Sequence, residues 1–278
     1  MTVVVPAVAG ASRMRARAHV RTELQGGRTR LEVLRSQAPL SLRPTIPRQS
    51  EPWAQFVDDP AHLCMTAAAA GPLGGDELVL EVEVGAGSAL VLTESSATLV
   101  LPGHDGAQSR MRVRARVAPG GAFVWLPQPV IAAAGCDHLN DVAVELAPDA
   151  QFVMREQLLL GRKDEDSGHL RQRVRVRRDG RPLLAQDLDL GSATGSSPAV
   201  AGPHRAVGSL LVVDPRLDAG SSALLDEDGA VLPLAGGGAV LVNALAADNT
   251  GLRRQLGQAL VLIGEQLIPP AEKEQETP

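Results

Sequence analysis

Short stretches of alternating residues, separated by turns, constrain this 278-residue chain more than any other feature. Residues 110–117 place arginine at every even position and an apolar residue at every odd one, and residues 172–178 follow a similar pattern. Such period-two alternation buries one face of a strand and leaves the other in water. Turn-forming glycine, proline and aspartate recur between these stretches. The pattern predicts a mainly-β protein.

Composition excludes several partner classes. Hydrophobic residues make up 44% of the chain and charged residues 21%, which suits a globular protein with a sizeable core. The chain has no Tyr, 3 Phe and 2 Trp, and its net charge is −5. It is therefore poorly equipped to stack bases or to attract a phosphate backbone, and no nucleic-acid partner is expected. Two cysteines, Cys64 and Cys136, favour a reducing compartment.

Neither a targeting signal nor a membrane span is predicted. The apolar start is too short for a signal peptide, and no run approaches the roughly 20 apolar residues that cross a bilayer. A cytoplasmic protein without a membrane partner is expected. The predicted organisation is a flexible N-terminus over residues 1–14, a single β domain over residues 15–267 and a disordered tail over residues 268–278.

An internal repeat organises the middle of the chain. Residues 84–92, 117–125 and 146–154 each read as an apolar residue, a tight turn, a small residue and an apolar strand. The turns lie about 30 residues apart, a spacing found in stacked repeat architectures. Polar residues follow each strand, among them Glu94, Gln128 and Glu156. Stacked parallel coils would set these side chains in a row; unrelated turn-then-strand units are the alternative.

Residues 171–190 are expected to form one hairpin around Asp179-Gly180. A three-residue loop would place Arg171 opposite Asp189 and Arg173 opposite Asp187. A two-residue loop would place the same arginines opposite Leu188 and Gln186. Charge pairing favours the longer loop.

Only the C-terminus is predicted to be helical. Asn249 or Thr250 can cap a segment whose apolar residues follow at helical spacing. Residues 42–60 are expected to form a long irregular connection, and residues 192–203 an exposed loop.

Motifs for catalysis or tight metal binding are missing. The chain lacks GxxxxGK[ST], HExxH, CxxC and GxSxG, and neighbouring histidines are at least 31 residues apart. We therefore expect no enzyme activity and assign no metal site firmly. The run from Cys136 to His138 is interpreted as a turn beside a buried cysteine. Residues 163–166 are interpreted as a solvated loop, with a weak cation contact as the alternative.

The arginines that alternate with apolar residues in residues 110–117 and 172–178 have two interpretations. They can meet an acidic partner, or they can pair within the sheet with Glu81, Glu83, Asp187 and Asp189. Internal pairing is the favoured interpretation.

Several segments occur in a fixed order over most of the chain. They are Gly27–Arg35, Ala38–Leu40, Leu42–Pro44, Leu73–Asp76 with residues 78–84, Gly85–Ala97, Val124–Ile131, Met154–Glu156 with Gly161-Arg162, His204–Asp214 and Val240–Leu260. Together these segments resemble the UreD (UreH) family of urease accessory proteins. Gln128 stands where that family usually has Glu, so the chain resembles a divergent member.

The resemblance implies a fold and a role. It implies a helix-like, solenoid-like stack of β-sheets with about two helices, one of them C-terminal. It implies a maturation chaperone that works with UreF and the GTPase UreG and helps deliver nickel to apo-urease. Nickel would be a transient cargo, since no tightly bound cofactor is expected. A small-molecule- or sugar-binding β module and a purely structural scaffold are the alternatives.

The candidate residues are of two kinds. Conformational freedom at a turn is the role expected of Gly74, Gly75 and Gly161. A nickel passage, or a structural polar row, is the role expected of Asp76, Glu94, Gln128, Glu156 and Arg162.

Overall fold

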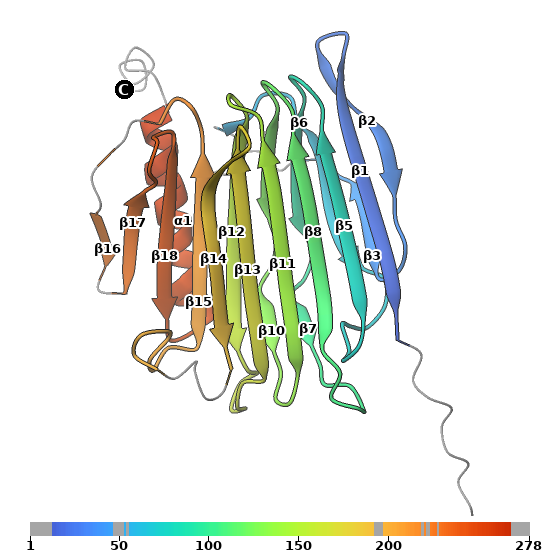
Figure 1. The fold of residues 1–278 in the computed structure, drawn as a ribbon, viewed down its shortest axis with the longest axis vertical. Helices are drawn as coiled ribbons and strands as arrows, with labels where there is room; N and C mark the ends of the chain where they lie inside the picture. Colours follow the sequence, from blue (N-terminus) through green and yellow to red (C-terminus); the bar gives the residue numbers. More distant parts are fainter. Residues whose placement is uncertain are drawn as a thin grey trace, which may run out of the picture.

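The computed structural model describes residues 13–46, 53, 56–191, 197–217, 220, 223–226 and 228–267. Within these residues the chain forms two β-sheets that face each other, with one helix behind the second sheet (Figure 1). The predicted tail at residues 268–278 lies outside the described residues, as do residues 1–12 of the predicted flexible N-terminus.

Sheet A has seven strands in the order β14-β13-β11-β8-β5-β1-β2. Strands β1, β5, β8, β11 and β13 run parallel, and β2 and β14 close the two edges antiparallel. Its strands are β1 (Arg15–Gln25), β2 (Arg28–Arg35), β5 (Glu77–Val84), β8 (Ser109–Val117), β11 (Asp137–Leu146), β13 (His169–Arg178) and β14 (Arg181–Leu190).

Sheet B has eleven strands. Its main order is β16-β17-β18-β15-β12-β9-β6-β4-β3, and β7 and β10 pair beside β12. Its strands are β3 (Leu40–Pro44), β4 (Ala61–Ala67), β6 (Ala89–Glu94), β7 (Thr98–Val100), β9 (Ala122–Leu126), β10 (Val130–Ala132), β12 (Gln151–Leu160), β15 (Ala206–Val213), β16 (Ala223–Asp226), β17 (Gly229–Pro233) and β18 (Ala239–Ala246).

The repeat forms three successive coils. Strands β5, β8 and β11 lie in sheet A, and each continues through a tight turn into β6, β9 or β12 of sheet B (Figure 1). In sheet B, Leu90, Phe123 and Phe152 occupy one rung of the ladder, as the sequence alignment of the repeat requires. The solenoid-like stack predicted from the repeat is therefore confirmed.

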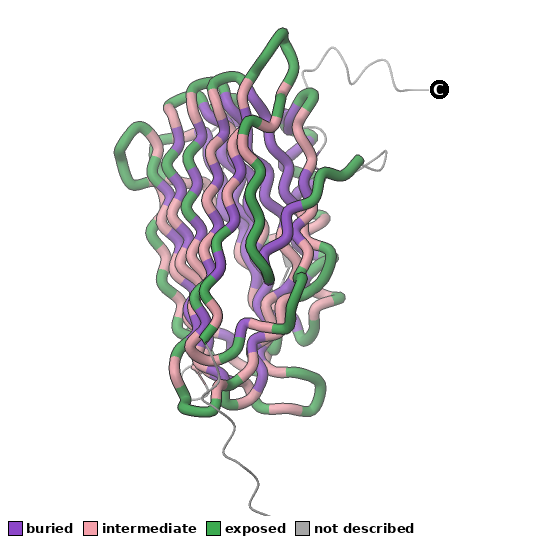
Figure 2. The backbone as a smooth tube through the Cα atoms, turned by 90° about the vertical axis from the view of Figure 1, so that its right-hand side faces the viewer, coloured by how far each residue is buried: buried purple, intermediate pink, exposed green. Residues whose placement is uncertain are grey.

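One apolar core fills the space between the sheets, and a second lies between sheet B and the helix. Figure 2 shows buried positions alternating with half-buried and exposed ones along the strands. Alternation explains this arrangement, because the apolar residue of each pair points inward and the charged residue points outward.

Helix α1 (Asn249–Leu267) packs on the outer side of sheet B against β15, β18 and β12. The buried Leu252 and Leu256 confirm the predicted apolar stripe. The cap differs from the prediction, because the Asp248 carboxylate accepts the backbone N–H of Gly251 at 2.9 Å. The second helix that the resemblance implied is not found among the described residues; they contain α1 alone.

The hairpin of β13 and β14 has the predicted charge register but not the predicted loop. Arg171 pairs with Asp189 and Arg173 with Asp187, yet the loop is the two residues Asp179 and Gly180, both with positive φ. A bulge at Leu183 supplies the extra residue that restores the register. The length of the loop was therefore predicted wrongly although the pairing was right.

Other predicted segments are only partly described. Residues 47–52 and 54–55 of the irregular connection and residues 192–196 of the exposed loop lie outside the described residues. In the remainder of that loop, Ala201 is buried, so the segment is not exposed throughout.

Candidate functional site

The three polar residues that follow the repeat strands line a common cavity between the sheets. Glu94, Gln128 and Glu156 lie in its wall, and its volume is about 90 Å³. The backbone N–H of Gln128 donates to Glu94 Oε2 at 3.2 Å, which joins two of the coils directly. Parallel stacking produces this arrangement, since equivalent positions of successive coils lie side by side.

Glu156 is a buried carboxyl without a cationic partner among its hydrogen bonds. Ser209 Oγ donates to Glu156 Oε2 at 3.1 Å, and Gln172 Nε2 donates to Glu156 Oε1. These donors come from β15 and β13, so the contact ties both sheets to β12. Burial is the main influence and raises the pKa of Glu156 to about 7, although the two hydrogen bonds oppose it.

Glu94 has a similar electrostatic setting. Burial of its carboxyl group raises the pKa of Glu94 to about 7, and the hydrogen bond from the Gln128 backbone lowers it in part. Both carboxyls of the row can therefore gain or lose a proton near neutral pH. A carboxyl group of this kind binds a divalent cation only after it has lost its proton. Its metal affinity is therefore weak and depends on pH.

His138 also lines the cavity but has no free ring nitrogen. Its Nδ1 lies 2.8 Å from Ser109 Oγ and its Nε2 lies 2.9 Å from Asn140 Oδ1. Burial lowers the pKa of His138 to about 4, so the ring is neutral at physiological pH. This histidine is therefore a structural member of the wall.

Several polar atoms in the cavity wall have no hydrogen-bond partner within the described chain. They are Trp125 Nε1, Gln172 Oε1 and both amide atoms of Gln157. Buried polar groups are almost always satisfied by protein or by ordered water. Ordered water in the cavity can satisfy these atoms, although most residues of its wall are apolar.

Two further cavities adjoin the first one in series. A cavity of about 70 Å³ shares the wall at Glu94 and Met65. A cavity of about 400 Å³, next to β15 and β18, shares the wall at Glu156 and Leu158. Glu94 and Glu156 therefore each line two of these three cavities, which are together called the chain of cavities.

Asp76 and Arg162 lie away from this chain of cavities. The buried Asp76 carboxylate accepts the backbone N–H groups of Met14 at 2.8 Å and Leu73 at 2.9 Å, which holds the turn before β5. The exposed Arg162 guanidinium pairs with Glu165 at 2.6 Å. Each side chain has a structural partner in place.

The three turn glycines meet different requirements. A Cβ on Gly74 would lie 2.4 Å from the backbone nitrogen of Gly103, so only glycine permits this close approach. Gly75 and Gly161 adopt φ of +89° and +85°, a region that favours glycine. All three therefore shape the backbone.

Sequence reasoning missed part of the cavity wall. It did not single out Gln157, Gln172, Asn140 or Ser209, which come from four different strands. Gln172 did carry a signal, because it occupies an inward position of β13 otherwise filled by Leu170, Val174 and Val176. Among the described residues, no group of three His, Cys, Asp or Glu is placed to hold a metal ion.

Within the part of the chain that the structure describes, no helix meets the length and hydropathy of a membrane span.

Comparison with known proteins identifies the family. The model of the family described as "UreD urease accessory protein" matches residues 14–275. A "Urease accessory protein UreD" of Frankia casuarinae is 39% identical over 92% of this chain and 92% of its own length. One from Streptomyces avermitilis is 40% identical over 91% of this chain and 98% of its own length. "Urease accessory protein UreD 2" of Saccharopolyspora erythraea is 40% identical over 88% of this chain and 86% of its own length. The chain thus belongs to the UreD family of urease accessory proteins.

Proposed function

We propose that this chain is a non-catalytic urease maturation factor that works with UreF and UreG to deliver nickel to apo-urease. The relatives' shared description as urease accessory proteins supports the maturation role. In this proposal nickel is a cargo that moves through the chain of cavities, and the protein has no tightly bound cofactor. We place its work in the cytoplasm, without a nucleic-acid or membrane partner.

The observation that carries the proposal is that Glu94 and Glu156 each line two neighbouring cavities. Nickel stands high in the affinity order of divalent metals, so a closed set of three or four ligands would trap it. Isolated carboxyls with a pKa near 7 and neighbouring amides provide oxygen ligands that bind and release. Asp76 and Arg162 have no part in this route and serve as structural residues.

A reconstituted activation assay tests the proposal. It contains apo-urease, UreF, UreG, GTP, bicarbonate and nickel, with this chain or without it. The double variant Glu94→Gln/Glu156→Gln keeps the shape of both side chains and removes their ability to ionise. We expect it to slow activation about ten- to a hundredfold, the range typical of lost metal-site groups.

Glu77→Gln/Glu265→Gln is the matched control, because both carboxylates are exposed and neither lines these cavities. It is expected to activate like the wild type. Equal activation without the chain would overturn the maturation role. Wild-type rates in the cavity variant would overturn the route through Glu94 and Glu156.

A further inference from the structure

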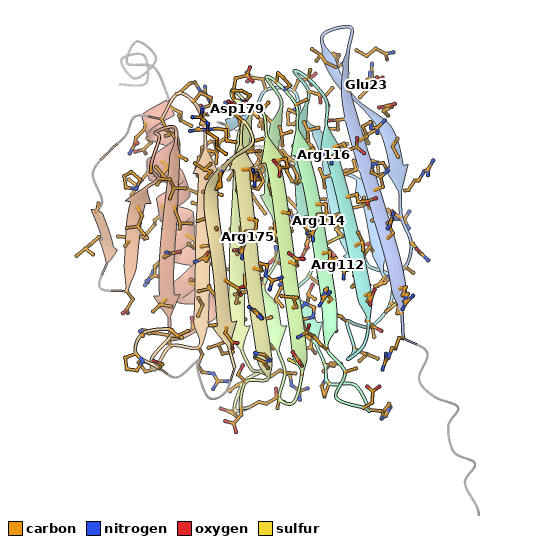
Figure 3. The ribbon with its side chains drawn as sticks, in the orientation of Figure 1. Glu23, Arg112, Arg114, Arg116, Arg175 and Asp179 are labelled. Atoms are coloured by element: carbon orange, nitrogen blue, oxygen red, sulfur yellow. The ribbon has the colours of Figure 1, made fainter. Side chains whose placement is uncertain are left out.

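The outward face of sheet A is rich in arginine, and its centre is strand β8. The inward side chains of β8 enter the core, so its four arginines all point to the same outer side, about 7 Å apart along the strand. Figure 3 shows Arg112, Arg114 and Arg116 on this face, with Arg175 two strands away. Every second residue of each strand in sheet A points outward, so the outward side chains of neighbouring strands form one continuous surface.

Side chains of β1 bind Glu81 and Glu83, the carboxylates that were expected to pair with the arginines of β8. Glu83 lies 2.8 Å from Arg21 and 2.9 Å from His19, both on β1. Glu81 lies 3.6 Å from Arg17. The favoured internal pairing with Glu81 and Glu83 is therefore wrong for β8, because both glutamates pair with β1. The predicted pairing with Asp187 is confirmed for Arg171 and Arg173 of β13.

Two arginines of β8 remain without a carboxylate. Arg114 binds Asp141 at 2.8 Å, although Arg112 stands opposite Asp141 in the ladder, so one carboxylate serves two arginines. Among the described residues, neither Arg112 nor Arg116 makes a hydrogen bond or an ion pair. Arg110 binds only the side-chain oxygen of Gln108, at 3.5 Å.

Strand β13 has the same shortage of carboxylates. Arg171, Arg173 and Arg175 converge on Asp187 at 2.8, 3.3 and 3.9 Å. Like charges on neighbouring strands repel one another, and a single carboxylate offsets only part of that repulsion. Acidic groups from a partner would relieve it.

The excess of positive charge extends over the five parallel strands, although the whole chain carries −5. Arginines outnumber carboxylates at their outward positions. The arginines are Arg15, Arg17, Arg21, Arg110, Arg112, Arg114, Arg116, Arg171, Arg173, Arg175 and Arg177, and the carboxylates are Glu23, Glu77, Glu81, Glu83, Asp137, Asp141 and Glu145.

We propose that the outward face of sheet A, centred on Arg112 and Arg116, docks an acidic protein surface within the urease maturation assembly. Guanidinium groups bind carboxylates through paired hydrogen bonds, and both side chains are available for this contact. A protein fits this face better than a nucleic acid does, because Glu81, Asp141 and Asp187 interrupt the basic rows and would repel a continuous phosphate backbone. The choice of partners rests on the proposed function.

A charge reversal tests the docking face. Arg112→Glu/Arg116→Glu changes the face, and Arg253→Glu/Arg254→Glu makes the same change of net charge on the exposed side of α1, behind the other sheet. Binding of each protein to purified apo-urease and to the UreF–UreG complex is measured by calorimetry at low and high salt. For one of these partners, we expect the face variant to bind at least about tenfold more weakly at low salt, with the difference shrinking at high salt.

Three results would overturn the proposal. They are unchanged affinity of the face variant for both partners, an equal loss in the α1 control, and a loss of binding to inorganic polyphosphate without a loss toward either protein. Arg112→Gln/Arg116→Gln, with an intermediate expected effect, guards against misfolding, and circular dichroism checks each variant. Failure of the wild-type chain to promote activation would instead refute the proposed function, so the two failures are distinguishable.

Discussion

Glu156 shows how one side chain links the coils, the cavity and the response to pH. Its carboxyl lies among Gln172, Ser209 and apolar residues, where the protonated form is favoured. A carboxyl with a pKa of about 7 when folded and an ordinary value when unfolded binds more protons in the folded state. Its stabilising contribution is therefore complete below the unfolded value and is lost as the pH rises through about 7.

This linkage predicts a pH-dependent stability that Glu156→Gln reduces. In the wild type, Glu156 alone should lower the free energy of unfolding by about 2 kcal/mol between pH 5 and pH 7. The amide oxygen can accept from Gln172, and the amide N–H can donate to Ser209 Oγ, so both contacts persist with one direction reversed. The amide does not ionise, so the variant should show a smaller slope over the same range. Urea unfolding at pH 5, 6 and 7 measures it. Parallel curves for the two proteins would show that the pKa of Glu156 is the same in the folded and unfolded states.

Asp76 is predicted to act in folding and not in nickel transfer. Asp76→Ala leaves two backbone N–H groups without their acceptor and should lower the free energy of unfolding by about 1–3 kcal/mol. Asp105→Ala removes an exposed ion pair with Arg13 and should change stability by less than about 0.5 kcal/mol. Chemical denaturation compares them. A stable Asp76→Ala protein that fails to activate urease would place Asp76 on the metal route instead.

At the scale of elements, helix α1 covers the outer side of sheet B. Sheet B consists partly of parallel strands that are apolar on both faces, as β9 with its five buried residues shows. Such strands need cover on both sides, and α1 supplies it over β15 and β18. Sheet A needs no such cover, because its outward positions are charged.

Two substitutions on the same helix test this role. Leu256 is fully buried against sheet B, whereas Leu262 is 52% exposed. Leu256→Ala should lower the free energy of unfolding by about 2–5 kcal/mol, since it leaves a cavity under the helix. Leu262→Ala should cost less than about 0.5 kcal/mol. Equal losses, measured by guanidinium unfolding, would show that the helix does not rest on the sheet through this stripe.

At the scale of the whole molecule, the coils share one core. Buried residues of strands as far apart in the chain as β1 and β18 belong to the same apolar cluster between the sheets. Phe123 and Phe152 lie at its centre, with ring centroids 5.7 Å apart. No coil can lose its packing without exposing that of its neighbours, so the coils should unfold together.

Phe152→Ala tests this cooperativity. The change removes a fully buried ring and should lower the free energy of unfolding by about 3–5 kcal/mol. Tryptophan fluorescence and far-ultraviolet circular dichroism should shift to the same midpoint in the variant. Leu24→Ala, at a position 49% exposed, should leave the midpoint unchanged. Separate transitions for the two probes would mean that the coils unfold independently.

The sequence by itself determined the class of fold, the three coils and the order in which they stack. Alternation and turn residues are local properties, and parallel stacking repeats the same local choice, so Glu94, Gln128 and Glu156 could be placed in one row. The apolar stripe of α1 was equally legible, because helical spacing is also local.

Only the tertiary structure decided which charged and polar groups meet. Gln172 and Ser209 reach Glu156 because two sheets face each other there, and no sequence spacing encodes that contact. Competition for partners also involves strands far apart in the chain. Strand β1 binds the glutamates of β5, so Arg112 and Arg116 have no carboxylate partner among the residues that the structure describes. Such contacts depend on three-dimensional neighbours, whereas the strands that carry them depend on adjacent residues in the chain.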